Sequence, residues 1–147
     1  VGQSVVPHRQ NADGLRIPTS IPDHIDILGK FEQGGQMRLS VSSVIGNMEN
    51  IVDIYICGTK GTLRLCEKKD GKKRLYGASK GSDKLEQIII KDENRGMWRV
   101  EEEFINAIRG KEDISHTDFS TAVKYMEWTD AVTKSLKTGC VVQLPLR

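Results

Sequence analysis

The last third of the chain (98–145) constrains the fold most, because it carries two helical patterns separated by a short polar turn. In the first pattern the apolar residues recur at steps of three and four, which places them on one helix face. They are Val100, Phe104, Ala107 and Ile108. Acidic residues at 101–103 suit the positive end of the helix dipole, and Gly110 suits the left-handed residue that ends a helix.

The second helical pattern begins after Thr117 or Asp118, either of which can act as N-cap, and it ends at Gly139. Its apolar positions predict one buried stripe. The stripe consists of Phe119, Ala122, Val123, Met126, Thr129, Val132 and Leu136. The residues before these helices are patterned as strands, so we expect the helix pair to cover one face of a sheet.

Alternation of apolar and polar residues, interrupted by glycine-rich turns, predicts the strands. The predicted strands cover 1–8, 23–32, 36–45, 50–57, 62–67, 75–78 and 85–91, with a closing strand at 140–144. The result is an α+β, two-layer domain: a mostly antiparallel, open-faced sheet of about six or seven strands, with two main helices on one face. Residues 1–22 are expected to form an N-terminal edge strand and a loop (9–22), and residues 23–147 the domain itself.

Two turns invite a phosphate-binding interpretation. Gly58 and Gly61 form a G-x-x-G, but a dinucleotide fingerprint needs G-x-G-x-x-G opening a helix, so a β-hairpin turn is favoured. The basic run 68–74 centres on Asp-Gly, a strong hairpin-turn pair, and a solvated turn is favoured over a phosphate-binding patch.

Composition excludes several function classes. The 147 residues carry a net charge of +2 from 22 basic and 20 acidic residues, which gives no electrostatic reason to expect nucleic acid or an anionic membrane as partner. Three scattered cysteines argue against a disulfide framework and favour a reducing, cytoplasmic location. No zinc-ligand spacing occurs among the cysteines and histidines, so no metal site is predicted.

The C-terminal pattern F-I-x-A-I-R-G, then Y-M-E-x-T-D-A-V-x-x-S-x-x-x-G, then V-x-L-P resembles the end of the Gfo/Idh/MocA family of NAD(P)-dependent oxidoreductases. The matching residues are Phe104, Ala107, Ile108, Gly110, Glu127, Ala131, Ser135, Gly139, Val142, Leu144 and Pro145. Upstream, two strand–turn segments are also similar to the family. They contribute Asp23, Ile25, Leu28, Phe31 and Gly34, then Ile56, Gly58, Gly61 and Leu63. The resemblance covers residues 23–145.

The resemblance implies that the hydride chemistry belongs to an N-terminal Rossmann domain that is absent from this chain. In the family that part supplies a Glu-Lys-Pro motif and an Asp-x-x-x-His type motif, and neither is present here. No catalytic residue is therefore assigned. NAD or NADP is expected in the full-length protein, and none is expected to bind this fragment, which is not expected to be catalytic by itself. The chain begins with Val1, which agrees with a piece of a longer protein.

What the family's C-terminal domain adds is one wall of the substrate pocket, together with an open sheet face for oligomerisation. His8 and Arg9, and Arg95 and Trp98, are the substrate-binding candidates. The open face on the strand 36–45 would carry Gln36, Arg38, Ser40, Ser42 and Val44. The expected partners are the missing domain, further copies of the chain and a small-molecule substrate: a sugar, polyol or related carbonyl compound. The alternative is a non-catalytic α+β dimerisation or protein-interaction module without a cofactor.

Overall fold

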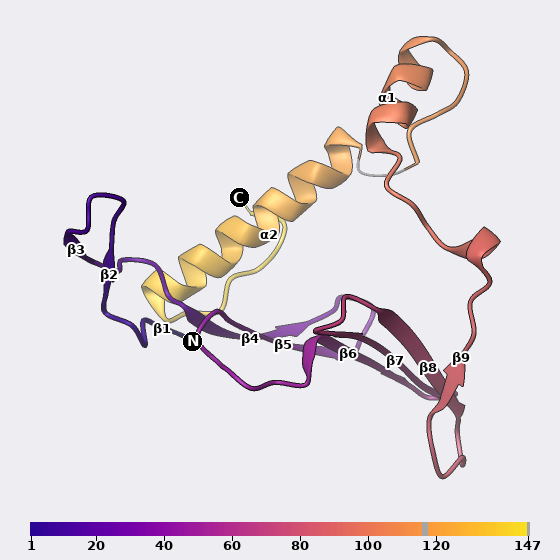
Figure 1. The fold of residues 1–147 in the computed structure, drawn as a ribbon, viewed down its shortest axis with the longest axis horizontal. Coiled ribbons are helices and arrows are strands. Elements are labelled where there is room, and N and C mark those ends of the chain that lie inside the picture. Colours follow the sequence, from indigo (N-terminus) through magenta and orange to yellow (C-terminus); the bar gives the residue numbers. More distant parts are fainter. Residues whose placement is uncertain (116–117, 147) are drawn as a thin grey trace. The chain divides into compact units, whose positions relative to one another are not determined.

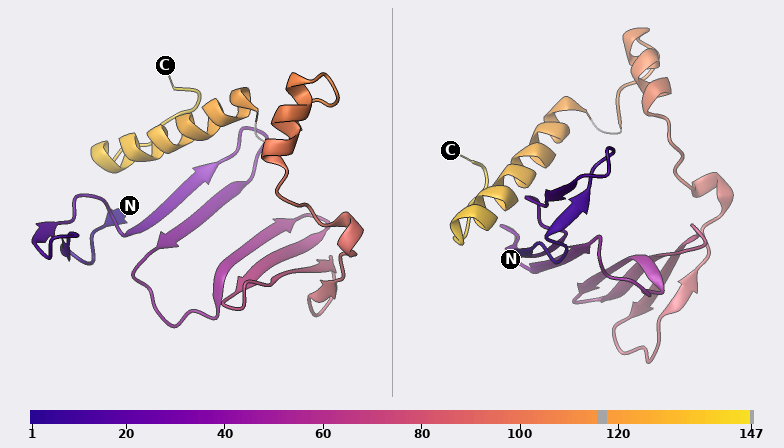
Figure 2. Two further views of the ribbon diagram at one scale, coloured as in Figure 1. Left: turned by 45° about the horizontal axis from the view of Figure 1, so that its top comes forward. Right: turned by 60° about the vertical axis from the view of Figure 1, so that its left-hand side comes forward.

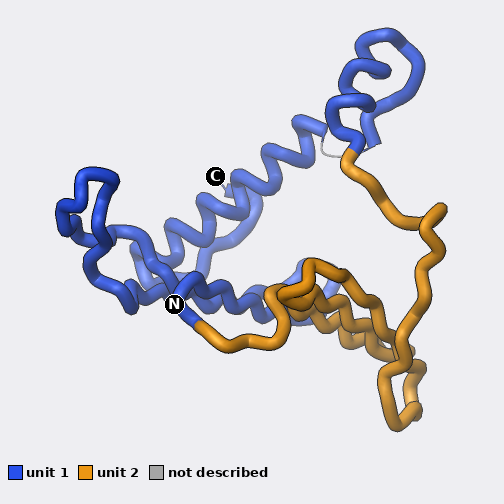
Figure 3. Tube along the Cα trace, viewed as in Figure 1, with its two compact units in different colours: residues 1–45, 99–147 blue, residues 46–98 orange. Residues whose placement is uncertain are grey.

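The computed structural model describes residues 1–115 and 118–146, and it divides the chain into two compact units. Unit 1 contains residues 1–45 and 99–147, and unit 2 contains residues 46–98 (Figure 3). In chain order the strands are β1 (Gly2–Gln3), β2 (His8–Gln10), β3 (Arg16–Pro18), β4 (His24–Lys30), β5 (Gln36–Ser42), β6 (Asn50–Gly58), β7 (Gly61–Lys68), β8 (Lys73–Ser79) and β9 (Glu86–Ile88). The helices are the 3-10 turn η1 (Asp92–Asn94), α1 (Val100–Ile108) and α2 (Phe119–Thr138) (Figure 1).

The fold class is α+β with antiparallel strand pairs, as predicted. The strands of the described residues differ from the prediction in number and grouping. They form three separate sheets, with the orders β1-β4-β5, β2-β3 and β6-β7-β8-β9. Several strands are short, and alternation over only two or three residues leaves no recognisable period in a sequence.

In unit 1, the apolar face of the β1-β4-β5 sheet is the face toward α2. A Cβ added at Gly2 would lie 2.9 Å from Leu136 of α2, and Gly2 pairs with Ile25. Directly paired residues of an antiparallel ladder share a face, so Ile25 and its partner Val41 also lie on the α2 side. Figure 2 shows α2 running along this sheet.

The α2 helix begins and ends as its sequence predicts. The Asp118 carboxylate accepts a hydrogen bond from the Thr121 N–H at 2.7 Å, and Gly139 adopts φ 68°, the left-handed conformation that closes a helix. The predicted stripe is only partly right. Ala122, Val132 and Leu136 are at least half-buried, but the fully buried residue is Ala131. Phe119, Val123, Met126 and Thr129 are exposed.

Two predictions for unit 1 are wrong. Residues 140–144 form no strand. This segment instead turns back toward α2, where the Ser135 hydroxyl donates to the Cys140 carbonyl at 2.8 Å and Glu127 accepts from the Leu146 N–H. The predicted loop 9–22 contains most of the β2-β3 hairpin, in which Arg9 pairs with Ile17. The turn residues Asn-Ala-Asp-Gly that indicated a loop are the turn of this hairpin.

Unit 2 is a four-stranded meander with one apolar and one polar face. Direct pairing puts Ile54, Leu65, Leu75 and Ile88 on the apolar face. Asp53, Tyr55, Arg64 and Tyr76 lie on the other. Both predicted turns are hairpins, with Gly58 paired to Gly61 in the first. In the second, Gly71 has φ 71° and the Asp70 carboxylate binds Arg74 at 2.8 Å, so the basic run is partly neutralised locally.

Candidate functional site

The β2-β3 hairpin carries the first pair of predicted site residues, His8 and Arg9. Its turn is closed by the Asn11 side-chain oxygen, which accepts from the Asp13 N–H at 3.0 Å and the Leu15 N–H at 2.9 Å. Side chains alternate across the hairpin, so His8 and Arg9 point to opposite faces. The His8 Nδ1 lies 3.5 Å from an Arg16 guanidinium nitrogen. One face of the hairpin therefore presents His8 beside Arg16, and the other presents Arg9; both faces carry groups that can donate hydrogen bonds to oxygen-rich ligands.

Arg9 faces the carboxylate of Asp23, the residue immediately before β4. Its guanidinium lies 3.6 Å from Asp23, whose side chain is 4% exposed. The pKa of Asp23 is lowered, first because the Val5 N–H donates to it, with the Val6 N–H and the Arg9 charge acting in the same direction against burial. The His8–Arg9 region is thus fixed at its base by an ionised carboxylate.

The second predicted pair, Arg95 and Trp98, lies in the segment between β9 and α1. The Arg95 Nε donates to the Ile90 carbonyl at 3.3 Å and lies 3.3 Å from Asp92. Trp98 is 79% exposed. This segment belongs to unit 2, whereas His8 and Arg9 belong to unit 1. The structure therefore places His8 and Arg9 on opposite faces of one hairpin, and Arg95 contacts Ile90 and Asp92 within its own segment.

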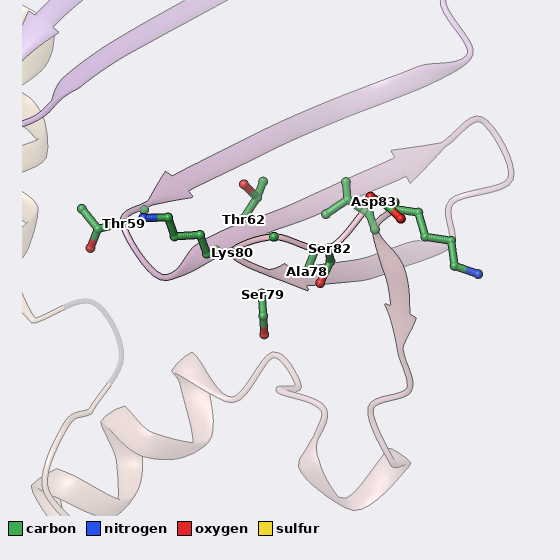
Figure 4. A pocket seen from close by; sticks show the side chains of 12 residues that line it. Thr59, Thr62, Ala78, Ser79, Lys80, Ser82 and Asp83 are labelled. Atoms are coloured by element: carbon green, nitrogen blue, oxygen red, sulfur yellow. The ribbon is translucent and has the colours of Figure 1, made fainter.

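A cavity of about 510 Å³ lies at one end of the unit 2 sheet, between the β6-β7 turn and the loop from β8 to β9 (Figure 4). The Lys80 N–H donates to the Lys60 carbonyl at 2.9 Å and joins these two segments. The lining consists of hydroxyl residues, glycines, the apolar Ala78 and Leu85, and the charged Lys80, Asp83 and Lys84, without an aromatic residue. None of the four predicted site residues lines this cavity.

Sequence reasoning did not find this cavity, because its residues follow no motif that carries a chemical mechanism. The sequence signal is the run of small and hydroxyl residues around Lys80, and such a run is just as typical of an ordinary polar loop as of a cavity lining. The lining offers polar contacts, yet it contains no nucleophile–base pair and no histidine or cysteine.

The open faces of both sheets hold fixed charge pairs. On β4 and β5, the pKa of Asp26 is lowered, first by a hydrogen bond from Ser40 and next by one from His24. On β6 and β7, Arg64 binds both oxygens of Asp53 at 2.8 and 2.7 Å, and its guanidinium lies 5.1 Å from the centre of the Tyr55 ring. The Arg64 hydrogen bonds are the largest cause of the lowered pKa of Asp53.

The glycine turn at 58–61 and the titratable residues can be compared with what a dinucleotide and a metal ion require. The glycine pair at 58–61 connects two antiparallel strands and opens no helix, so the helix N-terminus that would hold a pyrophosphate is lacking there. Among residues 1–115 and 118–146, no group of three or more His, Cys, Asp or Glu side chains is arranged to hold a metal. In the same part of the chain, no helix has the length and apolar character needed to cross a membrane.

The fold and these surfaces define an α+β domain whose sheets carry open, partly charged faces. Comparison with protein families matches residues 2–144 to the C-terminal alpha/beta domain of the Gfo/Idh/MocA oxidoreductase family. The match spans nearly the whole chain, so the chain belongs to this family. Comparison with curated proteins and with solved structures gives no match.

Proposed function

We propose that this chain is the substrate-binding and oligomerisation domain of an NAD(P)-dependent oxidoreductase acting on a sugar, polyol or related carbonyl compound. The observation that carries the proposal is the family match over residues 2–144. Because no dinucleotide fingerprint is present, NAD or NADP would bind an N-terminal Rossmann domain outside this chain. The complete enzyme would act in the cytoplasm, which the three free cysteines support.

In this proposal, the β2-β3 hairpin and the segment before α1 supply parts of the substrate wall. His8 and Arg9 offer an imidazole and a guanidinium to the oxygens of a polyhydroxylated substrate, and Arg95 offers a second guanidinium. Trp98, which is largely exposed, offers an apolar surface for a sugar ring or for the companion domain.

The proposed subunit contact uses the face of β4 and β5 that points away from α2. The register places Leu28, Arg38 and Ser40 on this face, and Leu28 is 80% exposed. An open antiparallel sheet face can pair with its copy across a two-fold axis, with the same residues contributed by both subunits. Burying Leu28 there would contribute about 1.5–3 kcal/mol per subunit.

The subunit contact is tested by measuring the mass of the chain in solution by sedimentation at several concentrations. The wild-type chain is expected to self-associate, and Leu28→Lys should weaken the association about tenfold or more, because the new ammonium lies opposite Arg38. Leu15→Lys, on the hairpin turn and also exposed, is the matched control. A monomeric wild-type chain, or equal association of the two variants, would contradict this contact.

The enzyme assignment is tested by sequencing the coding region upstream of Val1. The expected result is a strand, a G-x-G-x-x-G segment and a helix, with a Glu-Lys-Pro motif, within about 150–200 residues. An unrelated domain at that position would favour the alternative, a non-catalytic dimerisation or protein-interaction module. Dinucleotide binding by the isolated chain would contradict the placement of the cofactor.

A further inference from the structure

We infer that the Asp23 side chain is the latch that holds the β2-β3 hairpin to the main sheet of unit 1, and thereby positions His8 and Arg9. The assignment of a substrate role to these two residues rests on the proposed function. The latch itself rests on hydrogen bonds, burial and connectivity in the chain. Asp23 is thus a positioning residue and makes no contact with a substrate in this account.

The hairpin has little other attachment to the rest of unit 1. Its two strands pair only with each other in the described residues, whereas β1, β4 and β5 form a different sheet. The hairpin is closed at its base by the Thr19 N–H, which donates to the Pro7 carbonyl at 2.8 Å. Its orientation therefore depends on the two connecting segments, 4–7 and 19–23.

Asp23, the last residue before β4, binds the connecting segment 4–7. Its two carboxylate oxygens accept separate backbone hydrogen bonds, from the Val5 N–H at 2.7 Å and the Val6 N–H at 2.9 Å. Both donors lie immediately before the hairpin. The Arg9 guanidinium, inside the hairpin, lies 3.6 Å from the same carboxylate. The Asp23 side chain thus contacts both the segment that leads into the hairpin and the first strand of the hairpin, β2.

The Asp23 backbone is equally fixed, so the carboxylate has a rigid base. Its N–H donates to the Gln3 carbonyl of β1 at 3.2 Å, and its carbonyl accepts from the Ser43 N–H, just after β5, at 2.9 Å. Asp23 is only 8% exposed, and a carboxylate that is removed from water in this way is held by its hydrogen bonds. Its position is therefore set by the sheet, and the hairpin follows it.

The charge environment of the carboxylate is simple. Arg9 is the charged side chain that faces it, from β2. His24, the next residue on β4, pairs instead with Asp26 at 3.2 Å. Since the pKa of Asp23 lies below the usual value of 3.8, the latch is closed at neutral pH and opens as pH falls through the lowered pKa.

The test is amide hydrogen exchange of this chain at Val5 and Val6, the two latch donors, in Asp23→Asn. The Asn side-chain oxygen can accept a hydrogen bond from one of these two N–H groups, but the NH₂ group of the same side chain then faces the other N–H. The exchange rates of these two amides should therefore rise about tenfold to a hundredfold. Asp13→Asn makes the same change on an exposed hairpin-turn residue and should leave both rates unchanged. Exchange at Ile27, in the middle of β4, reports whether the sheet is intact.

Further measurements keep the inference testable if Asp23→Asn fails to fold. In the wild-type chain, the protection of the Val5 and Val6 amides should fall at acidic pH while the protection of the Ile27 amide persists. The variant Arg9→Gln should reduce the protection of Val5 and Val6 less than Asp23→Asn does. Protection of Val5 and Val6 that stays constant as the pH falls, or an Asp23→Asn variant whose exchange at these residues is within twofold of wild type, would overturn the latch.

The latch and the proposed substrate role of His8 and Arg9 can be refuted independently of each other. If Asp23→Asn frees the hairpin and raises the KM of the complete enzyme, with Asp23→Glu restoring part of both, the two stand together. If it frees the hairpin and leaves KM and kcat unchanged, the latch stands, and the substrate role of His8 and Arg9 is wrong.

Discussion

Gly61 is the position at which a single methyl group should damage unit 2 most. It begins β7, facing Gly58 across the hairpin turn and Ser79 on β8. A Cβ at Gly61 would lie 2.2 Å from the Ala78 carbonyl oxygen and 3.1 Å from the Ser79 Cα. These are backbone atoms, so no side-chain rotation can relieve the overlap, and the end of β8 has to move away from β7.

The cost follows from the contacts that this movement breaks. Overpacking of a close contact costs about 1–3 kcal/mol, and each ladder hydrogen bond that opens costs about 1 kcal/mol. Gly61→Ala should therefore destabilise the chain by about 2–4 kcal/mol. For a chain of this length, the unfolding midpoint should fall by about 5–15 °C.

Gly58→Ala is the matched control, because it makes the same change in the same hairpin. A Cβ there would meet only the Gly61 carbonyl oxygen, at an ordinary contact distance of 3.6 Å. Its midpoint should stay close to that of wild type, since an added Cβ also restricts the unfolded chain. Thermal unfolding followed by circular dichroism compares the two variants. Midpoints that agree within about 2 °C would refute the close-approach argument.

Two further predictions concern the ends of the helices in unit 1. Glu103→Ala removes the buried acceptor of the Ser115 N–H and hydroxyl, so it should lower the free energy of unfolding, measured in urea, by about 1–3 kcal/mol. Glu103→Gln should lower it less. An Ala variant as stable as wild type would contradict this prediction. The Ser120 hydroxyl and the Thr121 N–H lower the pKa of Asp118, so its cap on α2 should persist at pH values above 3.8 and be lost as pH falls through the lowered pKa. Thr121 amide exchange measures that loss, and an Asp118→Ala variant should exchange fast at every pH.

Local chemistry made much of the fold predictable. The alternation around Ile25 and Ile27 identified β4, and Gly110 and Gly139 marked the helix ends because they adopt left-handed φ values of 66° and 68°. Such signals depend on residues close together in the sequence. The family assignment followed from the same short-range order of residues and is confirmed over residues 2–144.

The features that were missed depend on partners distant in sequence. The periodic pattern of α1 placed Val100, Phe104, Ala107 and Ile108 on one face. Phe104 is 49% and Ile108 68% exposed, however, and Glu103 is 2% exposed. The reason is the Ser115 donors, twelve residues away, which no helical period reveals. The segment 140–144 was predicted as a strand, but Ser135 of α2 binds its first residue, Cys140, and Glu127 of α2 binds Leu146 just after it.

The candidate site was the least predictable part. His8 and Arg9 were chosen because they lie at the end of the first predicted strand, close to where the family's Asp-x-x-x-His type motif, absent from this chain, would lie. Their substrate role stays a prediction, as does that of Arg95 and Trp98. Asp23 was noted only as a matching position, because its hydrogen bonds to Val5 and Val6 span about 18 residues of chain. Chemistry of this kind appears only when the backbone brings donors to an acceptor.

The discontinuity of unit 1 has a consequence for biosynthesis. Unit 2 is one continuous stretch and can close its meander as soon as residue 98 has left the ribosome, whereas the β1-β4-β5 sheet needs α2, which is complete only at residue 138. At translation rates of about 5–20 residues per second, roughly 5–20 s pass between the synthesis of residue 45 and that of residue 138, and α2 cannot cover the apolar face of the sheet before then. During this interval the nascent chain exposes Ile25, which is half-buried in the complete structure, so co-translational chaperones should bind it after residue 45 and release it only when α2 emerges.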